Sequence, residues 1–166
     1  MDKSFTYSEV RRRIDAILSD PCDWIAAMAT VSCELHAAFP YYNWTGFYRT
    51  VRTNHLQVGP YQGGHGCIDI PFSKGVCGAA ARTKKTQLVL DVGTFPGHIA
   101  CSSSTQSEIV VPIFAGDHSV VAVLDVDSDE PNSFDSVDQK HLERLCQMLG
   151  EKFGDEAVRL IDIKAE

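Results

Sequence analysis

Three of the six cysteines stand in sequence surroundings typical of loops and tight turns. Cys67 and Cys77 have glycine neighbours, and Cys101 lies in a long stretch without a hydrophobic period; the spacings along the chain are 10 and 24 residues. Glycine lets a backbone or a ligand approach closely, so these thiols are candidates for redox or nucleophilic chemistry. Cys77 begins a short predicted helix, whose dipole would lower the pKa of its thiol.

The other cysteines fall within predicted helices, where free cysteine is expected as a small buried hydrophobe; they are Cys22, Cys33 and Cys146. A zinc site is an alternative use of the loop residues. Side chains of the right type are His65, Cys67, Cys77, His98 and Cys101. The paired C-x-x-C spacing of structural zinc sites is missing, so we expect no metal.

Two carboxylates follow an apolar run. Asp125 and Asp127 occupy alternate positions after Val121 and Val123, which places them on one face of a predicted strand, about 7 Å apart. A half-buried pair of this kind can hold an ammonium group or keep one carboxyl group protonated. Alternatively, the strand simply emerges into solvent there. Glu108, at the start of another apolar strand, is a third acid.

Trp44 and Tyr48 lie four residues apart in a predicted strand and therefore share a face. Two interpretations remain open for this pair. Packing into the core is one, and an aromatic wall for an apolar or cationic group is the other.

The hydrophobic pattern predicts the elements that position these residues. Helices are expected over 8–18, 22–39 and 75–83, and strands over 44–51, 56–59, 67–71, 87–90, 108–115 and 119–127. A long loop covers 91–107, and a closing helix covers 135–153, with Asp135 or Ser136 as N-cap and Gln139 completing a capping box. Adjacent strands can pair as hairpins, which favours an α+β fold: a largely antiparallel sheet with helices packed on it.

Composition narrows the class of protein. With 166 residues, 44% of them hydrophobic, the chain fits one domain over 1–166: N-terminal helices 8–39, sheet and active-site loops 43–128, C-terminal helix 135–153. A net charge of −7 argues against a nucleic-acid binder with a basic surface. No apolar run is long enough for a bilayer, and the start lacks a signal-peptide core. We expect a cytoplasmic protein whose cysteines are mostly thiols.

Four strings resemble the free methionine-(R)-sulfoxide reductases, which are single-domain GAF proteins. They are G-V-C-G-A-A-A (75–81), F-P-G-H-I-A-C (95–101), S-E-I-V-V-P (107–112) and V-L-D-V-D-S (123–128). The match runs from about residue 30 to residue 153, and the P-G-H-I-A-C string and the cysteine spacing are specific to this family among GAF domains. The resemblance implies a GAF fold with a six-stranded sheet, usually as a homodimer, reduction of the R epimer of free methionine sulfoxide, no organic cofactor, and thioredoxin as reductant.

The resemblance also implies roles for single residues. Cys101 corresponds to the nucleophile, Cys67 to the resolving cysteine, and Cys77 to a third redox cysteine that is the alternative nucleophile. Substrate-binding positions correspond to Glu108, Asp125, Asp127, Trp44 and Tyr48. Ser102 stands where many members have aspartate. In such a reaction a thiolate attacks the sulfoxide sulfur, a cysteine sulfenic acid forms, and a second thiol converts it to a disulfide.

Other classes of protein remain possible from the sequence. A ligand-sensing GAF domain is one, although the cyclic-nucleotide pattern is only partly met, by Phe134 and Asp138, with Gln139 where glutamate is expected. A redox switch that forms a Cys67–Cys101 disulfide without turnover is a second. A bilin carrier, which needs only one reactive cysteine, is a third.

Overall fold

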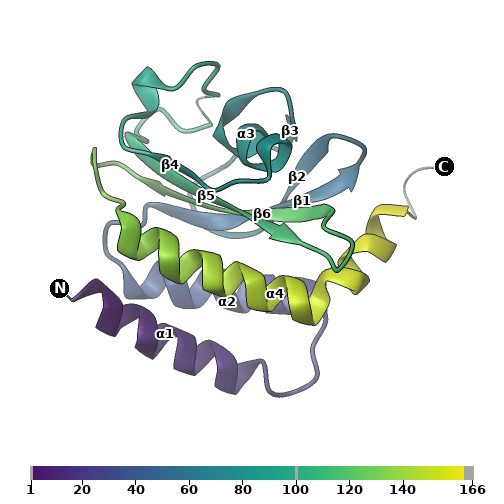
Figure 1. Ribbon diagram of the computed structural model, residues 1–166. Helices are drawn as coiled ribbons and strands as arrows, with labels where there is room; N and C mark the ends of the chain where they lie inside the picture. The colour runs from purple at the N-terminus through teal and green to yellow at the C-terminus, as the bar shows by residue number, and fades with distance from the viewer. Residues whose placement is uncertain (1, 100, 163–166) are drawn as a thin grey trace.

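A computed structural model describes residues 2–99 and 101–162 (Figure 1). The chain runs through α1 (Lys3–Ile17), α2 (Trp24–Ala38), β1 (Trp44–Arg52), β2 (His55–Gly63), β3 (Asp69–Pro71), α3 (Gly75–Thr83), β4 (Gln87–Val89), a 3₁₀ turn η1 (Val92–Thr94), β5 (Ser107–Phe114), β6 (Val120–Ser128) and α4 (Ser136–Asp162). The strands form one sheet in the order β3-β2-β1-β6-β5-β4, with every neighbouring pair antiparallel. The predicted α+β fold is confirmed.

The two faces of the sheet carry different layers. Helices α2 and α4 pack on one face, α1 packs beneath these two helices, and α3 lies with the long loops on the opposite face (Figure 1). Because both faces are covered, the central strands β5 and β6 are buried along almost their whole length. The sheet therefore separates a large core under the helices from a smaller one under α3.

Helix ends differ most from the sequence expectations. Helix α1 begins at Lys3 because the Asp2 carboxylate accepts a hydrogen bond from the Phe5 N–H (3.2 Å). Helix α4 continues to Asp162, well past the predicted end at Phe153. Gly154, the residue after the predicted end, lies inside the helix and permits close packing there, since a Cβ on it would lie 2.8 Å from Ala115 Cα.

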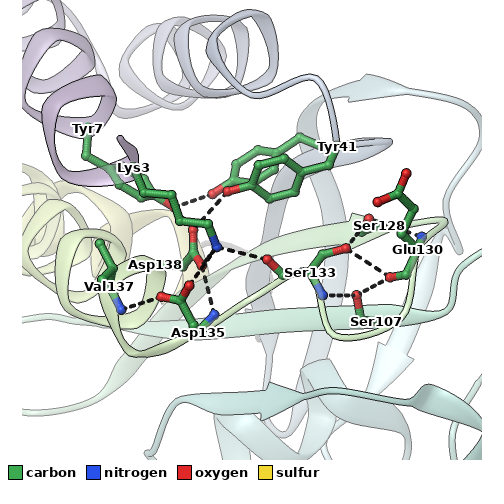
Figure 2. A network of polar contacts seen from close by, with 11 residues as sticks. Lys3, Tyr7, Tyr41, Ser107, Ser128, Glu130, Ser133, Asp135, Val137 and Asp138 are labelled. Carbon is green, nitrogen blue, oxygen red and sulfur yellow. Dashed lines mark hydrogen bonds and ion pairs between the residues drawn. The ribbon is translucent and has the colours of Figure 1, made fainter. Parts of the chain in front are cut away.

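The start of α4 is fixed by a reciprocal cap (Figure 2). The Asp135 carboxylate accepts from Val137 N–H (2.7 Å), and the Asp138 carboxylate accepts from Asp135 N–H (2.8 Å). Asp135 is thus the N-cap, and Asp138 completes the capping box in place of the predicted Gln139. Asp138 is fully buried and also accepts hydrogen bonds from Lys3 and Tyr7 of α1, which ties the first helix to the last.

The cysteines outside the site are not uniformly buried. Cys146 is buried, but Cys22 is half-buried and lies just before α2, and Cys33 is exposed on α2. The expectation of three buried cysteines is therefore wrong for Cys33, which falls on the solvent side of the helix. No helix within the described residues has both the length and the apolar character needed to cross a bilayer.

Candidate active site

Strand register brings the predicted acids together. Across β5, β6 and β1, Glu108 lies opposite Asp127, and Asp127 lies opposite Trp44. On β6, Asp125 lies two residues before Asp127 and is paired with Gly46 of β1. Side chains two apart in a strand share a face, so these residues all point toward the layer that contains α3.

A cavity opens over these rows. It has an empty volume of about 490 Å³, including the part open to solvent. Its walls come from β1, β5, β6, the start of α3, and the chain on either side of both loop cysteines. The predicted site residues among its lining are Trp44, Tyr48, Cys77, Cys101, Glu108, Asp125 and Asp127. One cavity thus collects every predicted site residue except Cys67.

A disulfide closes one wall of the cavity. Cys67 and Cys101 are 34 residues apart in sequence and their Cα atoms are 5.1 Å apart. The bond joins the glycine-rich segment before β3 to the long loop before β5. Cys101 lines the cavity, whereas Cys67 is not among the lining residues. With both sulfurs bonded to each other, neither can serve as a zinc thiolate in this form of the protein.

Burial dominates the electrostatics of the acids. Asp125 is 5% exposed and Glu108 is 6% exposed, so the alternative that the strand emerges into solvent is wrong at Asp125. Burial raises the pKa of Asp125 to about 6, while hydrogen bonding with Cys77 and Glu108 holds it down. Burial, and then the charges of Asp125 and Asp127, raise the pKa of Glu108 well above its ordinary value. Burial, and then the charges of Asp125 and Asp129, raise the pKa of half-buried Asp127 well above its ordinary value.

Cys77 shares this cluster. One donor atom each from Cys77, Glu108 and Asp125 lies within 4.8 Å of the other two. Burial, then the charges of Asp125 and Glu108, raise the pKa of the thiol well above its ordinary value. The expected lowering by the helix dipole is therefore wrong. A helix terminus contributes about 0.3–1 kcal/mol, which is less than the cost of burying a thiolate beside carboxylates.

The two aromatic residues form both a core and a wall. Tyr48 is buried, and its ring stacks on Trp44 with centroids 5.6 Å apart. The Trp44 indole N–H donates to Gly64 O (3.1 Å), and the Trp44 ring also stacks on Tyr61. A Cβ on Gly46 would meet the Trp44 ring at 2.7 Å, so the glycine makes room for the indole. Since both rings also line the cavity, the two interpretations of this pair are compatible.

His98 also belongs to the site, where the sequence had suggested only a metal ligand. It lines the cavity, and its Nε2 lies 3.9 Å from Glu108 Oε2. Burial lowers the pKa of the imidazole, which favours its neutral form. The available signal was its place three residues before Cys101, in the same loop.

Some backbone amides of the serine-rich segment after Cys101 form hydrogen bonds within the protein. Gln106 N–H donates to Ser128 O (2.8 Å), and Ser104 N–H donates to the Ser102 hydroxyl (3.3 Å). These two amides are therefore already bonded within the protein. Ser102 and Thr105 nevertheless line the cavity, so the segment as a whole borders the site.

Comparison with known proteins places this chain in a family. The GAF domain family matches residues 26–151. The free methionine-R-sulfoxide reductase of Saccharomyces cerevisiae is 43% identical over 133 residues, which are 76% of this chain and 74% of that protein. The Escherichia coli protein of the same name is 34% identical over 90% of this chain and 89% of its own.

A solved structure agrees with these sequence relatives. The free methionine-R-sulfoxide reductase from Neisseria meningitidis, in complex with its substrate, superposes with a TM-score of 0.87 at 40% identity, covering 96% of this chain and 93% of that one. Both the sequence and the fold match over nearly the full length. The chain therefore belongs to the GAF domain family and, within it, to the free methionine-R-sulfoxide reductases.

Proposed function

We propose that this protein is an L-methionine (R)-S-oxide reductase, which reduces the R epimer of free methionine sulfoxide to methionine. The observation that carries the proposal is the Cys67–Cys101 disulfide in the wall of a cavity that also holds three raised-pKa acids. Relatives of the same family carry this activity in their names.

In the proposed reaction, Cys101 is the nucleophile. A protonated carboxyl group, for which Glu108 is well suited by its raised pKa, donates a proton to the sulfoxide oxygen. The Cys101 thiolate attacks the sulfoxide sulfur, the sulfur–oxygen bond breaks, and oxygen passes to Cys101 as a sulfenic acid while methionine leaves. The Cys67 thiol then attacks the sulfenic sulfur, water leaves, and the disulfide forms. One sulfoxide is reduced and two thiols are oxidised.

Free methionine sulfoxide has two ends that the cavity can hold. Oδ1 of Asp125 is buried without a hydrogen-bond partner among the described residues, and a buried acceptor of this kind is costly unless a donor reaches it. The substrate ammonium group would be that donor, with Asp127 nearby. Trp44 and Tyr48 offer an apolar wall for the methyl group. Ile99, Cys101, Ser102 and Thr105 bring the loop against the cavity, which supports exclusion of a continuing peptide chain.

The reductant, the oligomeric state and the compartment are also part of the proposal. Thioredoxin is the expected reductant, the protein is expected to be a homodimer, and a reducing compartment such as the cytoplasm suits a cycle between thiols and a disulfide. These parts rest on the resemblance to the family.

A coupled assay tests the activity. Thioredoxin, thioredoxin reductase and NADPH are incubated with the protein and racemic methionine sulfoxide, and we expect NADPH consumption to stop near half of the added substrate because only one epimer reacts. No consumption, with normal reduction of the oxidised protein by thioredoxin, would support a redox switch instead. Equal turnover of a peptide that contains methionine sulfoxide would refute the exclusion of a continuing peptide chain by the loop.

Cysteine variants test the assignment of roles. Cys101→Ser is expected to abolish turnover, and Cys67→Ser is expected to complete one reduction and then stop, because the sulfenic acid has no resolving thiol. A single-turnover burst, measured as methionine formed per protein, separates the two variants. If Cys77→Ser alone removes the burst, Cys77 is the nucleophile and the assignment to Cys101 is wrong.

A further inference from the structure

The two cysteines of the disulfide differ in their neighbours. Cys101 faces the cavity with the acids. Cys67, half-buried like Cys101, is not among the lining residues; His65 and Gly66 before it border the cavity, whereas Ile68 and Asp69 after it are exposed on the way to the sheet edge. Cys101 is thus the cysteine of the pair that borders the cavity, and exposed chain follows Cys67.

An exposed apolar residue stands next to Cys67 in the chain. Ile68 follows Cys67 directly and is 70% exposed, the highest fraction among the large apolar residues of the described chain. Its position is fixed, because the Ile68 carbonyl accepts a hydrogen bond from Val58 N–H of β2 (3.0 Å). The chain then enters β3, the edge strand of the sheet. A single exposed isoleucine is unremarkable by itself, but this one is held next to a redox-active bond.

We propose that a protein dithiol reductant with an apolar rim around its thiols docks over Ile68 and attacks Sγ of Cys67. This inference rests on the proposed function, in which the disulfide is the oxidised product of each turnover. Apolar area that leaves water on docking provides the attraction, and the thiol of the partner must approach the disulfide from the solvent side.

The exchange balances in two steps. A thiolate of the partner bonds to Cys67 Sγ, the Cys67–Cys101 bond breaks, and its electron pair leaves on Cys101 as a thiolate. The second thiol of the partner, as a thiolate, then attacks the partner sulfur of the mixed disulfide, and Cys67 leaves as a thiolate. The partner becomes a disulfide, and both cysteines of this protein are reduced. Attack at Cys67 therefore releases Cys101 as a thiolate on the cavity side, where the sulfoxide binds.

The test compares two reductants on the oxidised protein, with no sulfoxide present. For Ile68→Ser we expect the second-order rate constant of reduction by thioredoxin to fall about tenfold, from the apolar contact that is lost. The rate constant with dithiothreitol, a small dithiol that needs no docking surface, should stay unchanged. Ile68→Val should restore most of the thioredoxin rate. The matched control is Phe5→Ser on α1, which removes an apolar side chain that is 66% exposed and should change neither rate.

A trapping experiment on the unmodified protein tests the point of attack. Thioredoxin that lacks its second cysteine stops at the mixed disulfide, and peptide mass analysis should find it on Cys67. A mixed disulfide on Cys101, or an equal fall of both rate constants for Ile68→Ser, would overturn the inference. Dithiothreitol-driven reduction of methionine sulfoxide tests the proposed function separately, because that assay needs no docking of a protein partner.

Discussion

Burial keeps a proton on the acid cluster at pH values where carboxyl groups in water are ionised. Glu108 and Asp125 have little contact with solvent, and the charge of Asp125 further raises the cost of charging Glu108. A thiolate nucleophile needs the opposite condition, since it forms as the pH rises. The reaction therefore depends on two titrations of opposite sign, which predicts a rate with a maximum.

The fall in reaction rate at high pH is expected from loss of the Glu108 proton. Because the folded pKa of Glu108 is raised, its protonated form persists above the usual range and is lost as the pH rises through the raised value. Glu108→Gln should lower the single-turnover rate by about 10²–10⁴-fold and remove the descending limb. Single-turnover rates of the reduced protein from about pH 5 to about pH 9 measure this. Asp117→Asn, in the exposed turn between β5 and β6, is the control, and a descending limb that survives in Glu108→Gln would assign the proton to another acid.

The thiol of Cys77 should be slow to react in the reduced protein. Its pKa is raised by burial and by neighbouring carboxylates, and the thiol form is a poor nucleophile. During alkylation by iodoacetamide at about pH 7, where an ordinary thiol with a pKa near 8.5 is partly ionised, we expect Cys77 to react after exposed Cys33. Peptide mass analysis over time gives the order. If Cys77 reacts as fast as Cys33, its thiolate is stabilised and its claim to be the nucleophile is strengthened.

At the scale of elements, α3 has to come very close to the chain that precedes it. A Cβ on Gly78 would lie 2.6 Å from Pro71 O and 3.0 Å from Phe72 O, which are backbone atoms with little freedom to move. Gly78→Ala should therefore shift α3 and destabilise the protein by about 1–3 kcal/mol, as overpacking does. It should also lower turnover, because adjacent Cys77 contacts the acids.

Urea denaturation and steady-state turnover measure the two effects of Gly78→Ala. The matched control is Gly64→Ala, since a Cβ on Gly64 would meet nothing within 4 Å. A Gly78→Ala protein as stable and active as Gly64→Ala would show that α3 tolerates displacement, contrary to the packing described above.

Local elements could be predicted from the sequence because their signals are local. The helix expected over 75–83 has the observed bounds, with Gly75 and Lys84 at positive φ at its two ends. Alternation along β6 correctly placed Asp125 and Asp127 on one face. The approach of Cys77 to these acids could not be predicted, since it depends on how α3 docks on strands far away in sequence. For the same reason the thiol pKa was predicted in the wrong direction.

At the scale of the whole molecule, the first helix and the start of the last helix meet in one polar network (Figure 2). Lys3 of α1 donates to Ser133 O (3.0 Å) and to Asp138 (2.5 Å), and Tyr41 donates to the same carboxylate (3.1 Å). Ser133 in turn bonds Ser107 and Ser128, the residues next to Glu108 and Asp127. The contacts that hold the first helix thus extend to the strand ends that carry the acids.

Removing the Asp138 carboxylate from this network should lower the free energy of unfolding. Asp138→Ala leaves the Lys3 ammonium and the Tyr7 hydroxyl without their common acceptor and deletes half of the α4 capping box. Breaking a buried ion pair from one side costs about 3–5 kcal/mol, so we expect the free energy of unfolding in urea to fall by about that amount. The comparison is Asp15→Ala, which removes a carboxylate that is 50% exposed from its pair with Arg11 and should cost less than about 1 kcal/mol. If the two variants lose equal stability, solvent reaches Asp138 during normal fluctuations, and α1 is not held to α4 by this network.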